Sequence, residues 1–196
     1  MDFAEFLRKL TLRRPAPARR VIPANLRPQV EPFKLEPQRP VTITRLFARL
    51  NEQLAEDTIV IADIGDSLFG ASELNIRGRT EFLSPAYYTS MGFSVPAALG
   101  AMTARPKSRV IVIVGDGAFQ MTGNELSTIV RRKLNPLVIV LDNEGYGTER
   151  FLHPGEWEYN NVHPWKYSKL PELYNGGTGY EVRTEGEFEA ALTKAW

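Results

Sequence analysis

Two residues that could bind a metal ion each lie just after an apolar, β-branched run. Asp116 follows the run 109–115, and Asn143 lies two residues beyond the end of the run 136–141. Carboxylate and amide oxygens are hard ligands, and Mg²⁺ uses few of them, completing its shell with water and phosphate. Glycines on both sides of Asp116 let the backbone approach a ligand closely. These residues predict a magnesium-bridged diphosphate site, although Gly-Asp-Gly alone also fits a tight strand-to-helix turn.

The runs that carry these two residues are typical of strands buried on both faces of a sheet. A helical segment separates them, which is the pattern of a βαβ unit. We therefore predict an α/β fold with an open, mostly parallel sheet and helices on both faces. Asp116 and Asn143 should then project from the carboxyl edge of the sheet, where open α/β folds bind ligands. Backbone N–H groups at the start of the helix after Gly117 should face the anion.

Residues 115–128 and 143–149 resemble the thiamine diphosphate motif of the 2-oxo acid decarboxylases. This group comprises pyruvate, indolepyruvate and phenylpyruvate decarboxylases. Its motif runs from Gly-Asp-Gly to Asn-Asn, and here the first Asn of the pair is Asp142. The second, which is the ligand, is retained as Asn143. The cofactors that the resemblance implies are thiamine diphosphate and Mg²⁺.

The resemblance assigns roles to single positions. It implies that Mg²⁺ is held by Asp116, Asn143 and the backbone carbonyl of Gly145, and that Ala118 and Phe119 donate backbone N–H groups to the diphosphate. A large apolar residue, here Met91, would support the bent cofactor, and the carbonyl of Thr89 would accept from its aminopyrimidine. The other cofactor-binding positions that we expect are Asp66, Ser67, Gly115, Gly117 and Tyr146.

The turn after the run 58–62 is expected beside the diphosphate. Pyruvate decarboxylases usually carry Thr where this chain has Asp66, and residues 65–69 look more like the aryl-pyruvate branch. A carboxylate beside a diphosphate is repelled unless it accepts hydrogen bonds or faces elsewhere. Ser67 is the alternative ligand at this turn.

One catalytic residue and one partner follow from the same resemblance. Glu149 falls where these enzymes carry a glutamate that handles protons during decarboxylation; without the motif, it would be a solvated helix residue. The glutamate that activates the cofactor belongs to a pyrimidine-binding domain of a partner subunit in a homodimer or homotetramer. The resemblance covers about residues 41–196, the C-terminal third of a full enzyme, ending before the last strand. We therefore expect the lone chain to be inactive.

Composition indicates the domain organisation and the kinds of partner. Residues 1–40 carry nine Lys or Arg and four acids in a chain with a net charge of +1, and seven prolines lie between Pro15 and Pro40. We interpret 1–40 as a helix remnant, 2–10, and a basic linker, followed by the cofactor domain 41–196. The linker lacks the interleaved aromatic residues of a nucleic-acid arm. The absence of cysteine and of long apolar runs favours a cytoplasmic protein without membrane or nucleic-acid partners.

The pattern also predicts the other elements. Helices are expected at 41–54, from Ser94 onward, at 123–132 and from Thr184 to Trp196, the last opened by a capping box. Strands are expected at 58–62, 81–83 and 180–183. His153 and His163 lack a carboxylate at metal-ligand spacing, and neither is expected to bind a metal.

The function that these features favour is non-oxidative decarboxylation of a small-molecule 2-oxo acid, of the aryl-pyruvate type, to an aldehyde and CO₂. One alternative is a carboligase similar to acetolactate synthase, which shares the cofactor motif. The Glu149 context and the lack of any flavin-related signal disfavour it. Another alternative is an incomplete, non-catalytic fragment that binds the cofactor.

Overall fold

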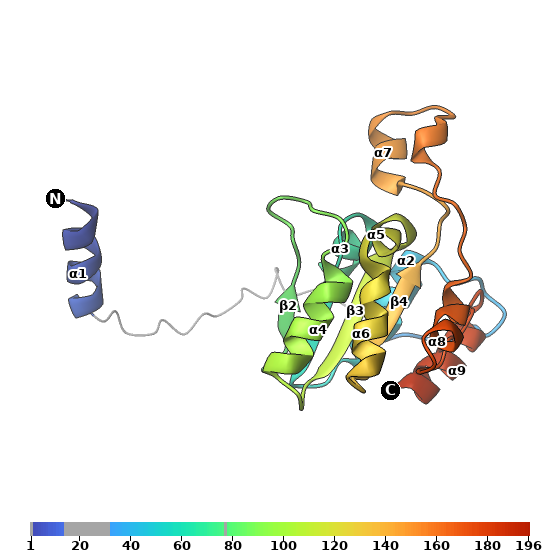
Figure 1. Ribbon diagram of the computed structural model, residues 1–196, viewed down its shortest axis with the longest axis horizontal. Coiled ribbons are helices and arrows are strands. Elements are labelled where there is room, and N and C mark those ends of the chain that lie inside the picture. Colours follow the sequence, from blue (N-terminus) through green and yellow to red (C-terminus); the bar gives the residue numbers. More distant parts are fainter. Residues whose placement is uncertain (1, 14–31, 77) are drawn as a thin grey trace.

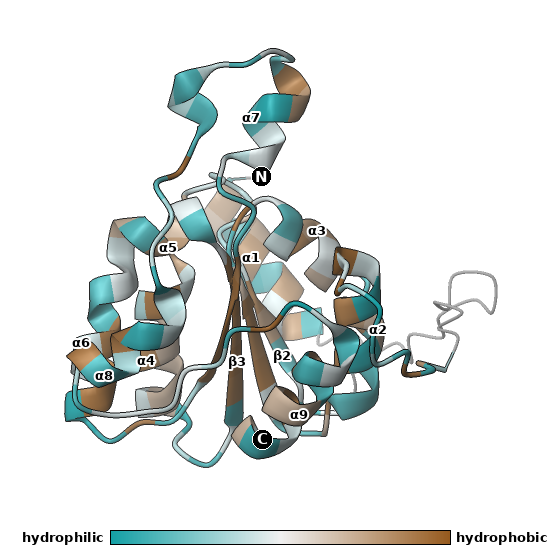
Figure 2. Cartoon of the chain, turned by 90° about the vertical axis from the view of Figure 1, so that its right-hand side faces the viewer, coloured by the Kyte–Doolittle hydropathy of each residue, from teal (hydrophilic) through white to brown (hydrophobic). Residues whose placement is uncertain are grey.

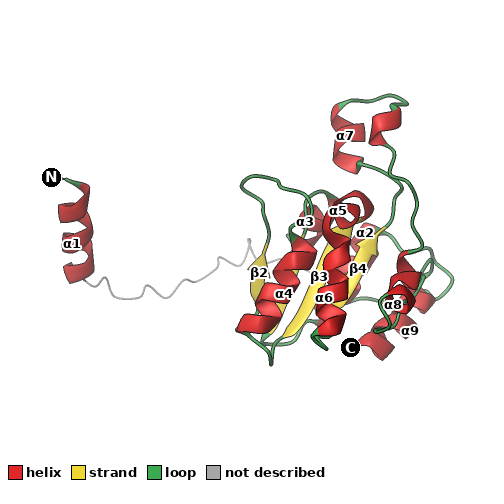
Figure 3. Cartoon of the chain, in the orientation of Figure 1, coloured by secondary structure: helices red, strands yellow, loops and turns green. Residues whose placement is uncertain are grey.

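The apolar, β-branched runs form one parallel sheet. The computed structural model describes residues 2–13, 32–76 and 78–196. Its strands are β1 (Thr58–Ala62), β2 (Glu81–Leu83), β3 (Arg109–Gly115) and β4 (Leu137–Leu141), in the order β2-β1-β3-β4 with every neighbouring pair parallel (Figure 3). All of β1 and residues 110–114 of β3 are buried, which explains their continuous apolar runs. The predicted open α/β fold is confirmed.

Helices cover both faces of the sheet. One face carries α2 (Ile43–Gln53), α3 (Asp66–Ala71) and α9 (Glu185–Ala195), and the other carries α4 (Ser94–Ala104), α5 (Asp116–Thr122) and α6 (Leu126–Arg131). Successive strand residues point to opposite faces, so Val60 and Ile111 pack in the first layer and Ile59 and Val110 in the second. Figure 2 shows the apolar strands between the two helix layers. The sheet is therefore fixed by two apolar cores, one on each face, and its carboxyl edge carries the polar residues.

Short elements complete the chain. They are α1 (Phe3–Arg13), α7 (Gly147–Leu152), α8 (Leu170–Leu173) and the 3-10 turns η2 (Gly123–Glu125), η3 (Glu158–Asn160) and η4 (Tyr167–Lys169). Segment α7–η3 projects beyond the carboxyl edge of the sheet, and α1 lies apart with no buried residue (Figure 1). The prolines of the predicted linker up to Pro28 lie outside the described residues. Across the three described ranges, no helix is both long enough and apolar enough to cross a membrane.

Two sequence-based element assignments are wrong. The segment 180–183 is not a strand. Val41 N–H donates to the Arg183 carbonyl at 3.0 Å and Glu185 N–H donates to the Arg39 carbonyl at 2.9 Å, which makes only an isolated bridge between Pro40 and Thr184. The Arg183 N–H donates to Glu187 Oε2 at 2.8 Å instead of extending a ladder. The segment 123–132 is not one helix: it begins as the 3-10 turn η2 and continues as α6, and α5 precedes it directly. Where α5 meets η2, Gly123 packs so closely on the Phe119 ring that a Cβ would collide with it.

Residues 32–40 pack against the N-terminal end of α9. Glu185 is 1% exposed and accepts from Arg45 Nε at 2.6 Å, from Arg45 Nη2 at 2.7 Å and from Glu36 N–H at 2.9 Å. The Arg45 guanidinium lies 4.4 Å from the centre of the Phe33 ring. These bonds, led by that from Arg45, lower the pKa of Glu185 to about 2, from an ordinary value of 4.5. These bonds join residues 32–40 and α2 to α9, which lies far away in the sequence.

Glu185→Gln tests this ion pair. The pKa of Glu185 is lower in the folded state than in the unfolded state, so its ionised form stabilises the fold. This stabilisation is complete at pH values above the unfolded pKa and is lost as pH falls through the folded pKa. We expect wild-type stability to decline between about pH 5 and pH 2, and the variant to have a melting temperature several degrees lower at pH 7 with a shallower acid decline. Calorimetric melting from pH 7 to pH 2 measures both. Glu181→Gln, at an exposed pair with Arg183, is the matched control; identical profiles for Glu185→Gln and wild type would exclude the proposed contribution.

Candidate functional site

The ends of β3 and β4 place Asp116 and Asn143 at one edge of the sheet. The two strands are adjacent and parallel, with Gly115 paired to Leu141. Asp116 therefore follows the last residue of β3, and Asn143 lies two residues beyond β4. Asp116 is 2% exposed, whereas Asn143 is exposed. The edge thus presents one buried carboxylate and one accessible amide.

A single backbone N–H joins these two side chains. The N–H of Gly145 donates to Asp116 Oδ2 at 3.0 Å and to Asn143 Oδ1 at 3.2 Å. The other carboxylate oxygen, Oδ1, accepts from the N–H of Gly117 at 2.7 Å. Two side-chain oxygens from neighbouring strands therefore converge on the Gly145 turn, as the strand pattern predicts.

The electrostatics of Asp116 favour a bound cation. Burial raises the pKa of this carboxyl above its ordinary value of 3.8, the N–H groups of Gly117 and Gly145 act in the opposite direction, and the charge of Asp142 raises it further. Within the described ranges, Asp116 forms no ion pair with Lys, Arg or His. A buried carboxylate without a positive partner would gain stabilisation from a divalent ion.

The end of β1 contributes a third polar turn. Asp66 and Ser67 begin α3, and Ser67 is buried with a hydroxyl that has no hydrogen-bond partner. A Cβ built on Gly147 would lie 3.3 Å from Asn143 Nδ2 and 3.6 Å from Asp66 Oδ2. The turns after β1 and β4 therefore approach each other around Gly147. A buried, unsatisfied hydroxyl calls for a partner, and an anion such as a diphosphate would supply acceptor oxygens there.

The loop between β2 and α4 carries the two residues expected near the cofactor rings. Thr89 has φ +54°, a left-handed conformation that is unfavourable for a β-branched residue. Met91 is 36% exposed, so it does not fill the core. Such strain persists only where the surroundings enforce it, and it is concentrated at functional sites. The loop therefore has a defined shape and an accessible apolar side chain.

Asp63 fixes this loop, a role that the sequence reasoning missed. This residue follows β1, is 0% exposed, and accepts from Gly92 N–H at 3.2 Å and Ser94 N–H at 2.9 Å. From the other side, Thr122 Oγ1 donates to the Gly92 carbonyl at 2.7 Å. The loop is thus anchored directly after Met91. The sequence does show an acid at the end of the strand run 58–62. Its position alone does not reveal which N–H groups it binds.

Asp63→Asn should loosen the loop. An amide offers one acceptor oxygen where the carboxylate offers two, so one of the two buried N–H groups loses its partner. We expect a loss of stability of about 1–3 kcal/mol in urea unfolding and faster amide hydrogen exchange in residues 86–94. Asp142→Asn, at an exposed acid after β4, is the control. Unchanged exchange in Asp63→Asn would show that the carboxylate does not hold the loop.

The remaining cofactor positions surround the same turn. Gly117 lies against the Tyr146 ring so closely that a Cβ would collide with it, whereas a Cβ on Gly115 would meet nothing within 4 Å. Ala118 and Phe119 are buried in the first turn of α5, where N-terminal N–H groups lack helical acceptors. The Phe119 ring packs edge-on against Tyr167, with centroids 5.4 Å apart. The Phe119 side chain therefore belongs to the core, and only its backbone could serve a ligand.

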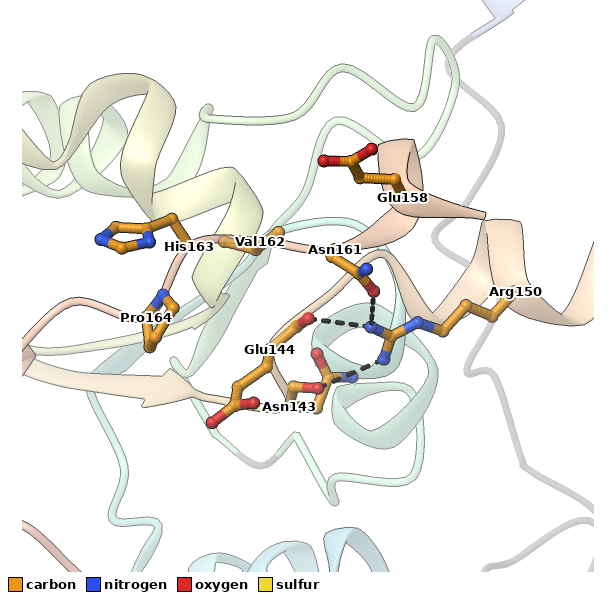
Figure 4. Close-up of a pocket in the computed structure, with 8 residues that line it drawn as sticks. All are labelled: Asn143, Glu144, Arg150, Glu158, Asn161, Val162, His163 and Pro164. Carbon is orange, nitrogen blue, oxygen red and sulfur yellow. Dashed lines mark hydrogen bonds between the residues drawn. The ribbon is translucent and has the colours of Figure 1, made fainter. Parts of the chain in front are cut away.

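Glu149 lies on the exposed part of α7, the element that projects beyond the sheet edge (Figure 1). The next residue, Arg150, helps to line an open hollow of about 670 Å³, together with Asn143, Glu144, Glu158, Asn161, Val162, His163 and Pro164 (Figure 4). The Arg150 guanidinium occupies one side of this hollow and bonds to the Asn143–Glu144 turn. Nothing in the sequence pattern indicated this contact.

The candidate metal ligands are not a group of several ionisable side chains. In the part of the chain that the structure describes, no three His, Cys, Asp or Glu residues are grouped to hold a metal ion. The oxygens that the structure brings together there are those of one carboxylate and one amide. This composition suits Mg²⁺, which keeps water and substrate phosphate among its ligands.

Comparison with known proteins adds independent findings. Residues 63–196 match the family model described as "Thiamine pyrophosphate enzyme, C-terminal TPP binding domain". The matched range begins at Asp63 and contains every sequence-predicted site residue. It also contains the whole of β2, β3 and β4.

Similar full-length proteins bear decarboxylase names. An "Alpha-keto-acid decarboxylase" of Mycobacterium avium is 34% identical over 86% of this chain and 31% of its own length. A "Pyruvate decarboxylase" of Aspergillus fumigatus is 36% identical over 76% of this chain and 27% of its own. "Pyruvate decarboxylase 3" of Arabidopsis thaliana is 33% identical, over 86% and 28% respectively. The chain thus spans less than a third of the length of these relatives.

Proposed function

The chain belongs to the thiamine pyrophosphate (TPP) enzymes, whose C-terminal TPP-binding domain it carries, and we propose that it binds the diphosphate of TPP through Mg²⁺ in a 2-oxo acid decarboxylase. The observation that supports this most directly is the shared Gly145 N–H, which brings Asp116 and Asn143 together at the carboxyl edge. TPP is the diphosphate ester of thiamine, so the magnesium-bridged diphosphate inferred from the residues and the family cofactor agree.

The proposed metal ligands are the Asp116 carboxylate, the Asn143 amide oxygen and the Gly145 carbonyl. Mg²⁺ would offset the buried charge of Asp116. Ser67 would donate its unpaired hydroxyl to the diphosphate, and Ala118 its first-turn N–H. Asp66, exposed at the start of α3, faces the same region and requires the cation to offset its repulsion from phosphate.

The ring end of the cofactor would lie on the loop that Asp63 anchors. Met91 would support the rings, and the Thr89 carbonyl would accept from the aminopyrimidine. When bound, TPP supplies an electron sink for loss of CO₂ from a 2-oxo acid. Glu149 would hold and transfer protons at the reacting atoms, which is the role of a general acid–base group. An aryl-pyruvate substrate is favoured by residues 65–69.

We also propose that a pyrimidine-binding domain of a partner subunit covers this edge in a homodimer or homotetramer. Large apolar side chains are exposed around it, including Phe151 (84%), Trp157 (50%) and Tyr87 (90%). Large apolar side chains left exposed on the projecting segment and on the loop between β2 and α4 would be covered by such a domain. Glu149 would lose its water on assembly, which matches the proton-transfer role better than its solvated position in the lone chain.

Calorimetric titration tests the proposal. TPP is titrated into the chain with 5-fold molar excess of Mg²⁺ and again with EDTA, and phenylpyruvate turnover is then assayed with and without a separately supplied pyrimidine-binding domain. We expect Mg²⁺-dependent binding, no turnover by the lone chain, and turnover after the domain is added. Absence of Mg²⁺-dependent binding would contradict the proposed site. In a parallel assay with pyruvate, formation of acetolactate instead of acetaldehyde would favour a carboligase.

A further inference from the structure

We propose that Arg150 is a positioning residue that holds the turn Asn143–Gly145 in the conformation needed to bind the metal ion. This inference rests on the proposed magnesium site. Arg150 is not one of the proposed ligands, and it lies on α7, outside the strand ends. Its effect would pass through the backbone of the turn.

The guanidinium bonds to both carbonyls that precede Gly145. Nη1 donates to the Asn143 carbonyl at 3.3 Å, and Nη2 donates to the Glu144 carbonyl at 2.8 Å. Nη2 also donates to Asn161 Oδ1 at 2.9 Å. Figure 4 shows the guanidinium between Glu144, Asn143 and Asn161, with all three bonds dashed. One side chain therefore ties the metal-binding turn to α7 and to the segment after η3.

The turn needs such support because its backbone is strained. Glu144 has φ +56°, a left-handed conformation that only the surrounding contacts can maintain in a non-glycine residue. Two backbone bonds also hold the turn: Tyr146 N–H donates to the Asn160 carbonyl at 2.9 Å, and Val162 N–H donates to the Glu144 carbonyl at 3.1 Å. The Glu144 carbonyl thus accepts from both Val162 and Arg150.

Gly145 completes the arrangement. A Cβ at this position would collide with the Arg150 guanidinium, so the glycine lets the guanidinium lie directly on the backbone. The same Gly145 donates the N–H that joins Asp116 and Asn143. Movement of Arg150 would therefore reorient the bond on which the two side-chain ligands converge. A lysine cannot replace this function fully, because its single ammonium lacks the rigid planar fork of a guanidinium.

The test measures metal affinity rather than turnover. Mn²⁺, which is visible by electron paramagnetic resonance, is titrated into wild type, Arg150→Met and Arg150→Lys at saturating TPP, against a protein-free blank. Loss of a group that orients a metal ligand weakens metal affinity by about 10–100-fold. We expect this loss for Arg150→Met, with an altered spectrum of bound Mn²⁺, and a smaller loss for Arg150→Lys. Arg132→Met, at the exposed residue that follows α6 and lies far from the Gly145 turn, should match wild type.

The outcomes separate this inference from the proposed function. No Mn²⁺ binding by wild type would overturn the proposed site and this inference with it. Equal affinity in wild type and Arg150→Met would overturn the role of Arg150 and leave the site standing. A metal-free melting temperature that falls in step with affinity would assign Arg150 a structural role instead. Asn161→Ala, which removes one acceptor of the guanidinium, should weaken Mn²⁺ binding less than Arg150→Met; no change would also count against the inference.

Discussion

Asp116→Ala is expected to weaken Mg²⁺-dependent TPP binding by more than about 100-fold. Loss of an outer partner of a metal ligand already weakens binding by about 10–100-fold, and loss of a ligand should exceed this. The substitution also leaves the N–H groups of Gly117 and Gly145 without their carboxylate acceptor. Titration calorimetry of wild type and variant gives the two dissociation constants.

The pH dependence of the same affinity provides a second readout. Because burial raises the pKa of Asp116, protons compete with the metal over a higher pH range than for an ordinary aspartate. Affinity should therefore fall as pH is lowered towards this raised pKa and recover as pH rises. Asp142→Asn, at the exposed acid beside Asn143, should change affinity by no more than a few-fold. A variant Asp116→Ala that binds TPP and Mg²⁺ as wild type does would remove Asp116 from the site.

Glu149→Gln is expected to lower kcat by about 100–10,000-fold, the usual contribution of a general acid–base group. TPP affinity should change little, because Glu149 lies on exposed α7 and not on the turn that holds the diphosphate. The measurement is aldehyde formation by the chain in the presence of the pyrimidine-binding domain.

A neighbouring residue supplies the control for this substitution. Glu156→Gln lies in the same projecting segment, is equally exposed, and should leave kcat unchanged. An unaltered kcat in Glu149→Gln would instead mean that Glu149 is a solvated helix residue, the alternative that applies without the motif.

The sequence predicted the fold well where local pattern decides structure. The β-branched run 109–115 needs burial on both faces, and it became the central strand β3. Thr184 and Glu187 form the expected capping box at the start of α9. The pattern failed at 180–183, where alternation was present but Val41 supplies a single backbone bond and the Arg183 N–H bonds to Glu187 Oε2. A strand needs a distant partner that continues the ladder, and a local pattern does not contain that partner.

The site was predictable to the level of strand ends but not of contacts. Asp116 and Asn143 each follow a strand, and neighbouring parallel strands end at the same edge of the sheet. The sequence therefore located both residues at one edge. The bonds from the Gly92 N–H to the Asp63 carboxylate and from Arg150 to the Glu144 carbonyl depend on loop conformations with positive φ. Such conformations arise from tertiary packing, so residue types and spacing did not reveal either positioning residue.

The most direct test of the central claim is the location of Mn²⁺ by anomalous diffraction in crystals of the chain grown with TPP and Mn²⁺. We predict one anomalous peak at the carboxyl edge, within coordination distance of a carboxylate oxygen of Asp116 and the amide oxygen of Asn143, with the diphosphate as a further ligand. A peak elsewhere, or bound TPP with no metal between these two residues, would contradict the account.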